Sequence, residues 1–308
     1  MSKTILAYGE LLWDILPDQT MLGGAPFNFA YRVNSLGDQS LFVSRIGRDS
    51  LGKIAIARVE KLGLDTSLIQ IDKEYPTGTV DVSFDDDNMP DYVIVPDTAY
   101  DRIQFSDRLL SFSRHADCIC FGTLIQRSHA SRATLKTILD HSPKVIKFLD
   151  INLRKDCFSK ESIIYSLEQA DILKLNDDEV GQICTLFDIK FNSYRTFCQY
   201  AVETWKLKYI LITFGQYGAC AYSKDGSFVY TPGYQIETVD SLGAGDAFSA
   251  GFLFQILRQA SLEQSCEFGN TLGALVATTK GATTPIHKSV IDKFKTNKSE
   301  RLFHPEFC

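Results

Sequence analysis

Residues 240–252, DSLGAGDAFSAGF, combine a loop of small residues with an acid at the start of an apolar run. Gly243, Ala244 and Gly245 would present backbone N–H groups at the start of a helix that we expect to run to about Gln259. The helix dipole predicts that the next residue, Asp246, stays ionised at neutral pH. An anion hole beside a proton acceptor suits transfer of a phosphoryl group to a hydroxyl. The alternative is a helix start with an acidic first-turn residue and no chemistry.

Other phosphate-binding motifs do not match this chain. It contains no G-x-x-x-x-G-K-[ST] sequence, and Phe248 stands where the dinucleotide fingerprint needs a small residue. Neither a P-loop enzyme nor a Rossmann dehydrogenase is therefore favoured.

Charge and composition exclude several classes of partner. The 308 residues carry a net charge of -6 and no run of five or more Lys or Arg, so neither nucleic acid nor a membrane surface is expected as a partner. No stretch approaches the ~18 apolar residues of a membrane span. The N-terminal MSKTILAYGELLWD predicts a first strand rather than a signal peptide. The eight cysteines lack metal spacing, which indicates reduced core thiols in a cytoplasmic protein.

Short apolar runs alternate with helical segments along the chain. This pattern predicts a single α/β domain over 1–308, with a mostly parallel central sheet flanked by helices on both faces. The predicted strands are 4–8, 41–43, 118–121, 145–149, 172–175 and 209–213, and the predicted helices include 52–62, 128–139 and 194–205.

Small and polar residues follow these strands. They are Gly9, Gly122, Asp150 with Asn152, Asn176, and Phe214 with Gly215. Because ligands of open α/β sheets bind outside the carboxyl ends of the strands, we expect these residues to line a binding crevice.

Two stretches, 11–22 and 76–95, break the α/β rhythm with alternating apolar and polar residues. We expect them to form one small antiparallel β sheet that projects from the edge of the crevice as a lid over bound substrate. The acid run Asp85–Asp87 reads as its solvated hairpin turn.

Six motifs in a fixed order carry a family resemblance: GGAPFNFAYRVNSLG, VSRIGRDSLG, DINLR, LKLNDDE, ITFGQYG and DSLGAGDAF. Together they make the chain similar to the ribokinase-type (PfkB) carbohydrate kinases, from Gly9 to about Pro285. The last motif resembles the family's D-T-x-G-A-G-D signature, with Ser241 in place of Thr, which keeps the hydroxyl. The resemblance implies a ribokinase-like fold.

The resemblance also implies roles at the phosphoryl-transfer site. Asp246 matches the catalytic base, and Gly243, Ala244 and Gly245 match the anion hole. Asn176 and Glu179 match the N-x-x-E motif that organises Mg²⁺, whose preferred ligands are oxygen atoms and water. Their spacing alone favours another interpretation, in which Asn176 caps a helix and Glu179 completes a capping box.

On the nucleotide side, ITFGQYG resembles the T-x-G-x-x-G segment. Thr213, Gly215 and Gly218 would then line the phosphates and ribose of ATP, whereas the glycines alone would indicate a hairpin turn. Asn270 matches a helix position near the adenine; the alternative is a polar surface residue.

On the sugar side, the resemblance assigns Asp14, Gly23, Gly24 and Asn28 to the hydroxyls of a polyol. Carboxylate and amide groups can bind such hydroxyls pairwise, and glycines let the backbone approach them. Arg154, in DINLR, would meet the sugar or the transferring phosphoryl group; a surface Arg at a helix start is the alternative.

We therefore expect ATP-dependent phosphorylation of a primary hydroxyl of a small-molecule sugar, foremost D-fructose to D-fructose 6-phosphate. GELLWD followed by GGAPFN looks more like fructokinases than like phosphosugar kinases, since Ala25 and Pro26 bring no charge to a second phosphate. A 2-keto-3-deoxygluconate or nucleoside kinase is the enzyme alternative, and a catalytically silent sugar- or nucleotide-binding regulator is the alternative of another class. Family members often dimerise through the lid, so a homodimer is expected, and use of a monovalent cation such as K⁺ stays open.

Overall fold

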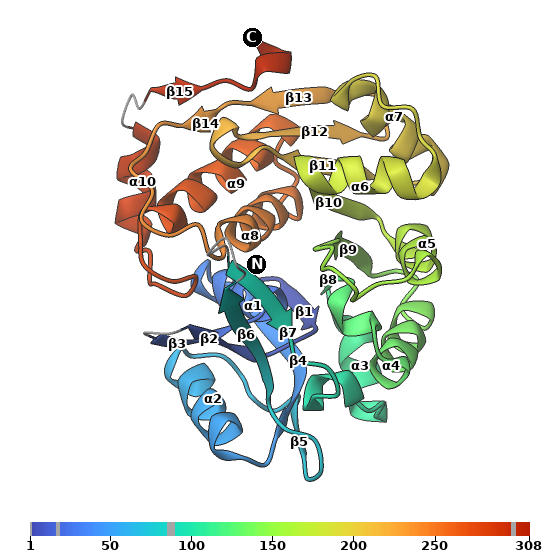
Figure 1. Cartoon of the computed structure of the whole chain (residues 1–308). Helices are drawn as coiled ribbons and strands as arrows, with labels where there is room; N and C mark the ends of the chain where they lie inside the picture. The colour runs from blue at the N-terminus through green and yellow to red at the C-terminus, as the bar shows by residue number, and fades with distance from the viewer. Residues whose placement is uncertain (1, 17–18, 85–89, 297–299) are drawn as a thin grey trace.

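A large, mostly parallel sheet forms the centre of the protein (Figure 1). The computed structural model describes residues 2–16, 19–84, 90–296 and 300–308. In this described part the sheet has nine strands in the order β13-β12-β11-β10-β9-β8-β1-β4-β5. Neighbours from β5 to β11 pair in parallel, and β12 and β13 extend the sheet antiparallel. The strands are β1 Thr4–Tyr8, β4 Gln39–Gly47, β5 Ile69–Asp72, β8 Cys118–Phe121, β9 Ile146–Asp150, β10 Ile172–Asn176, β11 Tyr209–Thr213, β12 Ala219–Ser223 and β13 Phe228–Thr231.

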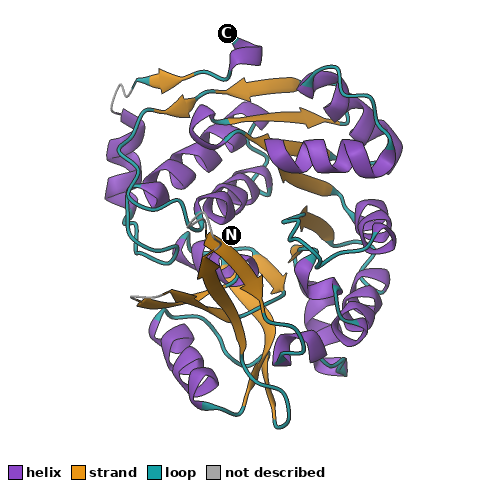
Figure 2. Ribbon diagram, in the orientation of Figure 1, coloured by secondary structure: helices purple, strands orange, loops and turns teal. Residues whose placement is uncertain are grey.

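Helices cover both faces of this sheet, as predicted (Figure 2). One face packs against α3 Asp107–His115, α4 His129–Asp140, α5 Lys160–Gln169, α6 Asp177–Phe187 and α7 Tyr194–Trp205. The opposite face packs against α1 Ala25–Ser35, α2 Ser50–Lys61 and α8 Ala244–Ile256. Helix α9 Leu262–Ala277 packs on α8 and against β12 and β13, and α10 Lys288–Thr296 packs on α9. The predicted α/β architecture is confirmed.

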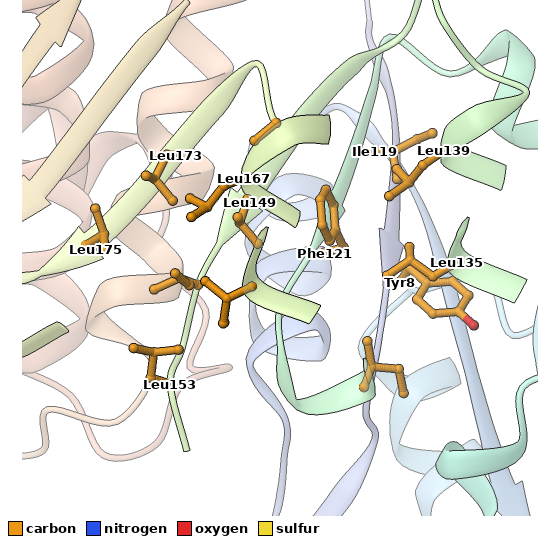
Figure 3. Packing of buried hydrophobic residues seen from close by; sticks show 14 of the residues in the cluster. Tyr8, Ile119, Phe121, Leu135, Leu139, Leu149, Leu153, Leu167, Leu173 and Leu175 are labelled. Carbon is orange, nitrogen blue, oxygen red and sulfur yellow. The ribbon is translucent and has the colours of Figure 1, made fainter. Parts of the chain in front are cut away.

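Strand β8 shows why the central strands read as unbroken apolar runs. Ile119 and Phe121 point into one helix layer, and Cys118 and Cys120 point into the other. A parallel strand with both faces buried needs apolar side chains at every position. Figure 3 shows Phe121 between its register partners Leu149 and Tyr8.

The cysteines follow the sequence prediction with one exception. Those at 118, 120, 157, 184, 198, 220 and 266 are buried and free. Cys308 is exposed, so its assignment to the core was wrong. It lies on a terminal turn outside the packed layers.

The small sheet is present and contains β2 Leu12–Leu16, β3 Gln19–Gly23, β6 Gly78–Phe84 and β7 Pro90–Ile94, in the order β3-β2-β6-β7. Each hairpin is antiparallel, as predicted, and a parallel pairing of β2 with β6 joins the two hairpins. Trp13 anchors β2 to α2, because its indole N–H donates to the Leu51 carbonyl at 3.2 Å. The predicted turn at Asp85–Asp87 lies outside the described residues.

Two smaller features complete the fold. α8 ends at Ile256, earlier than predicted, and Gln259 adopts the left-handed conformation (φ 61°), which does not continue a right-handed helix. Near the end of the chain β15 Arg301–Leu302 pairs with β14 Gly233–Tyr234.

No helix within the described ranges is long and apolar enough to cross a membrane.

Candidate active site

The glycine-rich loop and the start of α8 form the centre of the candidate site. Gly243 is the N-cap of α8 with φ 76°, and a Cβ there would collide with Ala282, so the position requires glycine. Asp240 holds the loop by accepting hydrogen bonds from the N–H groups of Leu242 (2.9 Å) and Gly281 (3.0 Å). The Ala244 N–H donates to the Ser241 carbonyl at 3.2 Å.

The amides that follow Ala244 suit an anion. The first-turn N–H groups of an α-helix have no acceptor within the helix, and those of Gly245 and Asp246 belong to this turn. These two amides are therefore better suited to bind an anion than that of Ala244, which already donates within the turn.

Asp246 lies in the first turn of α8 and contacts α1. The Asn28 amide donates to Asp246 Oδ2 at 2.9 Å, which joins two residues far apart in the sequence. Burial, reinforced by the charge of Asp150, raises the pKa of Asp246 to about 7, although Asn28, Lys174 and nearby Arg154 oppose the shift. With this pKa Asp246 is only partly ionised at neutral pH, which corrects the prediction that it stays ionised there, because desolvation outweighs the helix dipole.

A buried ion pair lies under the loop and was missed by the sequence analysis. Lys174 Nζ lies 3.0 Å from Asp150 Oδ1, and the Ser249 hydroxyl donates to Asp150 Oδ2 at 2.8 Å. A Cβ on Gly245 would lie 3.3 Å from the ammonium, which places this charge directly beneath the anion loop. A lysine within the apolar strand ILKLN was the signal that could have revealed it.

Burial alone would lower the pKa of Lys174, but the carboxylates of Asp150 and Glu179 hold it above its ordinary value. The ammonium therefore keeps its proton at neutral pH. A permanent positive charge beneath the loop favours a bound phosphoryl group.

Asn176 and Glu179 form a reciprocal capping box at the start of α6. Asn176 Oδ1 accepts from the Glu179 N–H at 2.7 Å, and Glu179 Oε2 accepts from the Asn176 N–H at 2.8 Å. Glu179 Oε1 accepts from the Leu153 N–H at 2.9 Å, so each carboxylate oxygen already binds one backbone group. The helix-cap interpretation is confirmed.

The carboxylates near the start of α6 and α8 fit a divalent cation only if other ligands complete its shell. The carboxylates of Asp150, Glu179 and Asp246 outnumber the Lys174 ammonium, and burial raises the pKa of Glu179. Within the described residues, however, no group of three His, Cys, Asp or Glu side chains is arranged to hold a metal by itself. Mg²⁺ commonly completes such a shell with phosphate oxygens and water.

The predicted sugar residues lie at the base of the small sheet. Asp14 is on β2, and a Cβ on Gly23 of the paired strand β3 would approach its Oδ2 to 2.5 Å. Gly24 is the N-cap of α1 with φ 114°, and a Cβ there would collide with the Glu10 carbonyl. Burial raises the pKa of Asp14 to about 6, and the charge of Arg154 opposes this shift.

Glu10 is a second residue of the site that sequence reasoning missed. It is 6% exposed, and its Oε1 accepts from the Ala25 N–H at 3.1 Å. Because the N-cap Gly24 has no side chain, Glu10 binds the first turn of α1 in its place. Burial raises the pKa of Glu10 to about 7. The polar residue after Gly9 at the end of β1 was the available signal.

A cavity joins these groups at the carboxyl ends of β1, β8 and β9. Its lining includes Glu10, Thr123, Asp150, Asn152 and Asp246. Arg154, on the exposed loop after β9, is close enough for its charge to act on Glu10, Asp14 and Asp246. The predicted transfer-side residue Asp246 therefore lines this crevice together with Glu10, Asp150 and Asn152. The predicted sugar-side residues Asp14, Gly23, Gly24 and Asn28 are not among its lining residues.

The predicted nucleotide residues gather at the neighbouring ends of β11 and β13. Gly215 and Gly218 have positive φ (53° and 88°) in the turn between β11 and β12, and a Cβ on Gly218 would collide with the Thr231 carbonyl. Asn270 on α9 is buried, and its amide donates to Thr231 O at 3.0 Å and to Thr231 Oγ1 at 2.8 Å. The polar-surface alternative for Asn270 was wrong. Thr213 ends β11 beside Asn176, its register partner on β10.

The architecture and the crevice together are those of an α/β protein of ribokinase-like fold, with its polar groups at the carboxyl ends of the strands. Residues 18–289 match the profile of the "pfkB family carbohydrate kinase". The chain belongs to this family.

Relatives extend over nearly the full chain. An uncharacterized sugar kinase of Pyrococcus horikoshii is 30% identical over 312 residues, which cover 94% of this chain and 95% of the relative. The fructokinase of Escherichia coli is 27% identical over 305 residues, with 93% and 97% covered. The fructokinase of Xylella fastidiosa with bound ATP superposes with a TM-score of 0.83 at 21% identity, covering 96% of this chain and 98% of that structure. The last comparison supports the fold.

Proposed function

We propose that this protein transfers the terminal phosphoryl group of ATP to a primary hydroxyl of a sugar, with D-fructose as the acceptor and D-fructose 6-phosphate as the product. The observation that carries the proposal is the Asp246 carboxylate, held by Asn28 at 2.9 Å and placed at the start of α8 beside the glycine loop. Membership of a carbohydrate kinase family and the 27% identity to E. coli fructokinase support it.

The chemistry requires a proton acceptor and stabilisation of phosphoryl charge. Asp246 accepts the proton of the sugar hydroxyl as its oxygen bonds to phosphorus, and the bond between the terminal phosphorus and the bridging oxygen of ATP breaks. The N–H groups at the start of α8, with Lys174 beneath them, stabilise the equatorial oxygens. Mg²⁺, oriented by Asn176 and Glu179 through water, would offset charge on the phosphates of ATP.

The acceptor sugar occupies the cavity between α1 and the strand ends. Asp14 and Asn28 bind its hydroxyls, Gly23 and Gly24 let the backbone approach it, and Arg154 closes the open side with a positive charge. Burial raises the pKa of Asp14 to about 6, so its carboxyl group can accept from or donate to a sugar hydroxyl at slightly acid pH. The fructokinase of Vibrio cholerae has been solved with fructose and ADP bound.

ATP lies across the turn after β11. Thr213, Gly215 and Gly218 approach its phosphates and ribose, and Asn270 supports the adenine end through the end of β13. The small sheet of β2, β3, β6 and β7 acts as a lid that limits transfer to water. Pairing of two such sheets would make the homodimer, which light scattering tests directly.

A second acceptor class is a nucleoside. An aminoimidazole riboside kinase of Salmonella enterica has the same fold, with a TM-score of 0.79. This likeness makes ribosides a second class of acceptor to test. The acid sugar 2-keto-3-deoxygluconate is a further acceptor to test.

A panel of acceptors in a coupled assay of ADP release tests the proposal. Fructose, ribose, 2-keto-3-deoxygluconate and a nucleoside are each supplied with MgATP, with and without K⁺. Phosphorylation of fructose with the highest kcat/KM supports the proposal. If another acceptor has the highest kcat/KM, that acceptor replaces fructose as the proposed substrate. Binding of sugar and ATP without ADP release would instead support the catalytically silent regulator.

A further inference from the structure

Residues 300–308, ERLFHPEFC, follow α10 and include β15, which pairs with β14 in a separate two-stranded sheet (Figure 1). Leu302 pairs with Gly233 in the β14–β15 ladder, and the Glu300 carbonyl accepts from the Gln235 N–H at 2.9 Å. This segment lies beyond residues 18–289, which match the family. It therefore adds contacts to the edge of the sheet that the family match does not include.

One tyrosine hydroxyl connects this segment to the turn after β11. The His304 N–H donates to the Tyr230 hydroxyl at 2.7 Å, and this hydroxyl donates to the Tyr217 carbonyl at 2.7 Å. Tyr217 lies between Gly215 and Gly218, the glycines of the candidate nucleotide turn. The segment thus holds a carbonyl inside this turn through a short chain of hydrogen bonds.

Aromatic side chains of this segment also pack against residues in and around the same turn. The His304 ring lies 4.6 Å from the ring of Phe214, which is 2% exposed, and the Phe307 ring stacks on Tyr230 at 4.2 Å. Glu306 accepts from the Tyr194 N–H at 2.8 Å, which ties the segment to the start of α7. These contacts therefore join residues 304–307 to the helix and strands around the turn.

The turn needs such support because it has few side chains of its own. Gly215 and Gly218 both have positive φ, and the turn packs backbone to backbone on Gly233, where a Cβ would collide with the Gln216 carbonyl. Glycines leave the unfolded and open states of a loop more conformational freedom than other residues do. External contacts must therefore restrict the turn to one shape.

We propose that residues 300–308 are a clamp that holds the turn 213–218 in the shape that binds the nucleotide, with Tyr230, His304 and Phe307 as positioning residues. The proposal rests on the proposed function, which places ATP at this turn. The clamp acts on nucleotide affinity and leaves the sugar cavity, at the opposite side of the transfer site, unchanged.

Tyr230→Phe is the sharpest variant, because it keeps the ring that stacks on Phe307 and removes only the linking hydroxyl. Loss of an ordinary hydrogen-bond link should raise the Kd for MgATP, measured by calorimetry, roughly fivefold. The KM for the sugar should change less than about twofold, within the spread of changes that leave a site intact. Tyr222→Phe, on the neighbouring strand β12, is the matched control and should leave both constants unchanged.

Hydrogen exchange gives a readout without nucleotide. The N–H groups of Phe214, Tyr217 and Gly218 form hydrogen bonds within the turn, so they are protected when the turn is closed. They should exchange faster in ligand-free Tyr230→Phe and Phe307→Ala than in the wild type. Phe303→Ala removes a ring that is 51% exposed on the same segment and should leave their exchange unchanged.

The outcomes separate the clamp from the proposed function. The clamp alone is overturned if the wild type binds MgATP and the variants show the same affinity for MgATP and the same rates of amide hydrogen exchange. A rise in the constants for sugar and nucleotide by the same factor also overturns it, because that indicates general loss of structure. A folded wild-type chain that does not bind MgATP overturns the proposed function and with it the nucleotide role of the clamp.

Discussion

The proposed sugar side and the proposed nucleotide side of the site differ in chemical composition. The sugar and transfer side contains carboxyl groups with raised pKa, namely Glu10, Asp14 and Asp246, beside the buried Lys174–Asp150 pair. The nucleotide side consists of glycines with positive φ, backbone contacts and aromatic rings. We infer that changes of charge should impair the first side most, whereas changes of shape should impair the second.

The largest effect is expected for Asp246→Asn. The substitution keeps size and polarity but removes the acceptor for the hydroxyl proton, so turnover should fall by roughly 10²-fold or more. The Kd for MgATP should change little, and the fold should be kept. Steady-state kinetics with saturating sugar and MgATP, together with calorimetry, measure both. Near wild-type turnover would show that Asp246 is only a first-turn acid.

The pH dependence of kcat/KM for the sugar should expose the same carboxylate. Asp246 must be unprotonated to act as base, and its pKa of about 7 predicts that kcat/KM falls about tenfold per pH unit well below pH 7. A profile that is flat from pH 5 to 8 would contradict the assignment.

The free energy of unfolding should decrease as the pH rises through 7, whereas kcat/KM increases. A carboxyl whose pKa is raised in the folded state binds more protons there than when unfolded, so its contribution is complete below the unfolded pKa of about 4 and is lost as pH rises through about 7. Denaturation of the ligand-free protein should therefore become easier between pH 5 and 8. Asp246→Asn should flatten part of this slope.

A change of shape tests the nucleotide side. Gly218→Ala adds a Cβ that collides with Thr231 O at a backbone φ of 88°, so the turn must shift. The KM for ATP should rise roughly tenfold, because a shifted turn would lose part of its contacts with the nucleotide. Gly226→Ala is a matched control, since Gly226 has a similar φ of 90° and an added Cβ there would meet only the Tyr222 hydroxyl oxygen, at an ordinary contact distance of 3.9 Å. Equal effects of the two variants would assign the loss to backbone strain alone.

The smallest effect is expected at Glu10, which acts through the first turn of α1 rather than on the reacting atoms. Glu10→Ala removes the acceptor of the Ala25 N–H and loosens the helix that carries Asn28. Turnover should fall roughly fivefold, as expected for loss of a helix-capping interaction that positions the site. Glu10→Gln keeps an acceptor oxygen and should restore most of it. A Gln variant as slow as the Ala variant would instead assign the role to the charge of Glu10.

Much of the local architecture could be predicted from local patterns. Strands β1, β8 and β11 and helix α7 have the predicted bounds, and the residues after the central strands do meet at one edge of the sheet. The parallel pairing of the central strands follows from the α/β alternation, because parallel neighbours require helical crossovers, whereas the strand order, with β1 between β8 and β4, was not predicted. The small sheet was also predicted, except for the parallel pairing of β2 with β6.

What the sequence by itself determined are the features that depend on neighbouring residues: the glycine-rich start of α8, the capping box of Asn176 and Glu179, and the class of fold. The tertiary structure decided the features that depend on distant ones. Glu10 reaches Ala25, Lys174 reaches the underside of the anion loop, and His304 reaches Tyr230 only after folding. The pKa of Asp246 belongs to this second group. Desolvation of a carboxyl group depends on all the atoms packed around it, and most of them come from residues outside any short sequence motif.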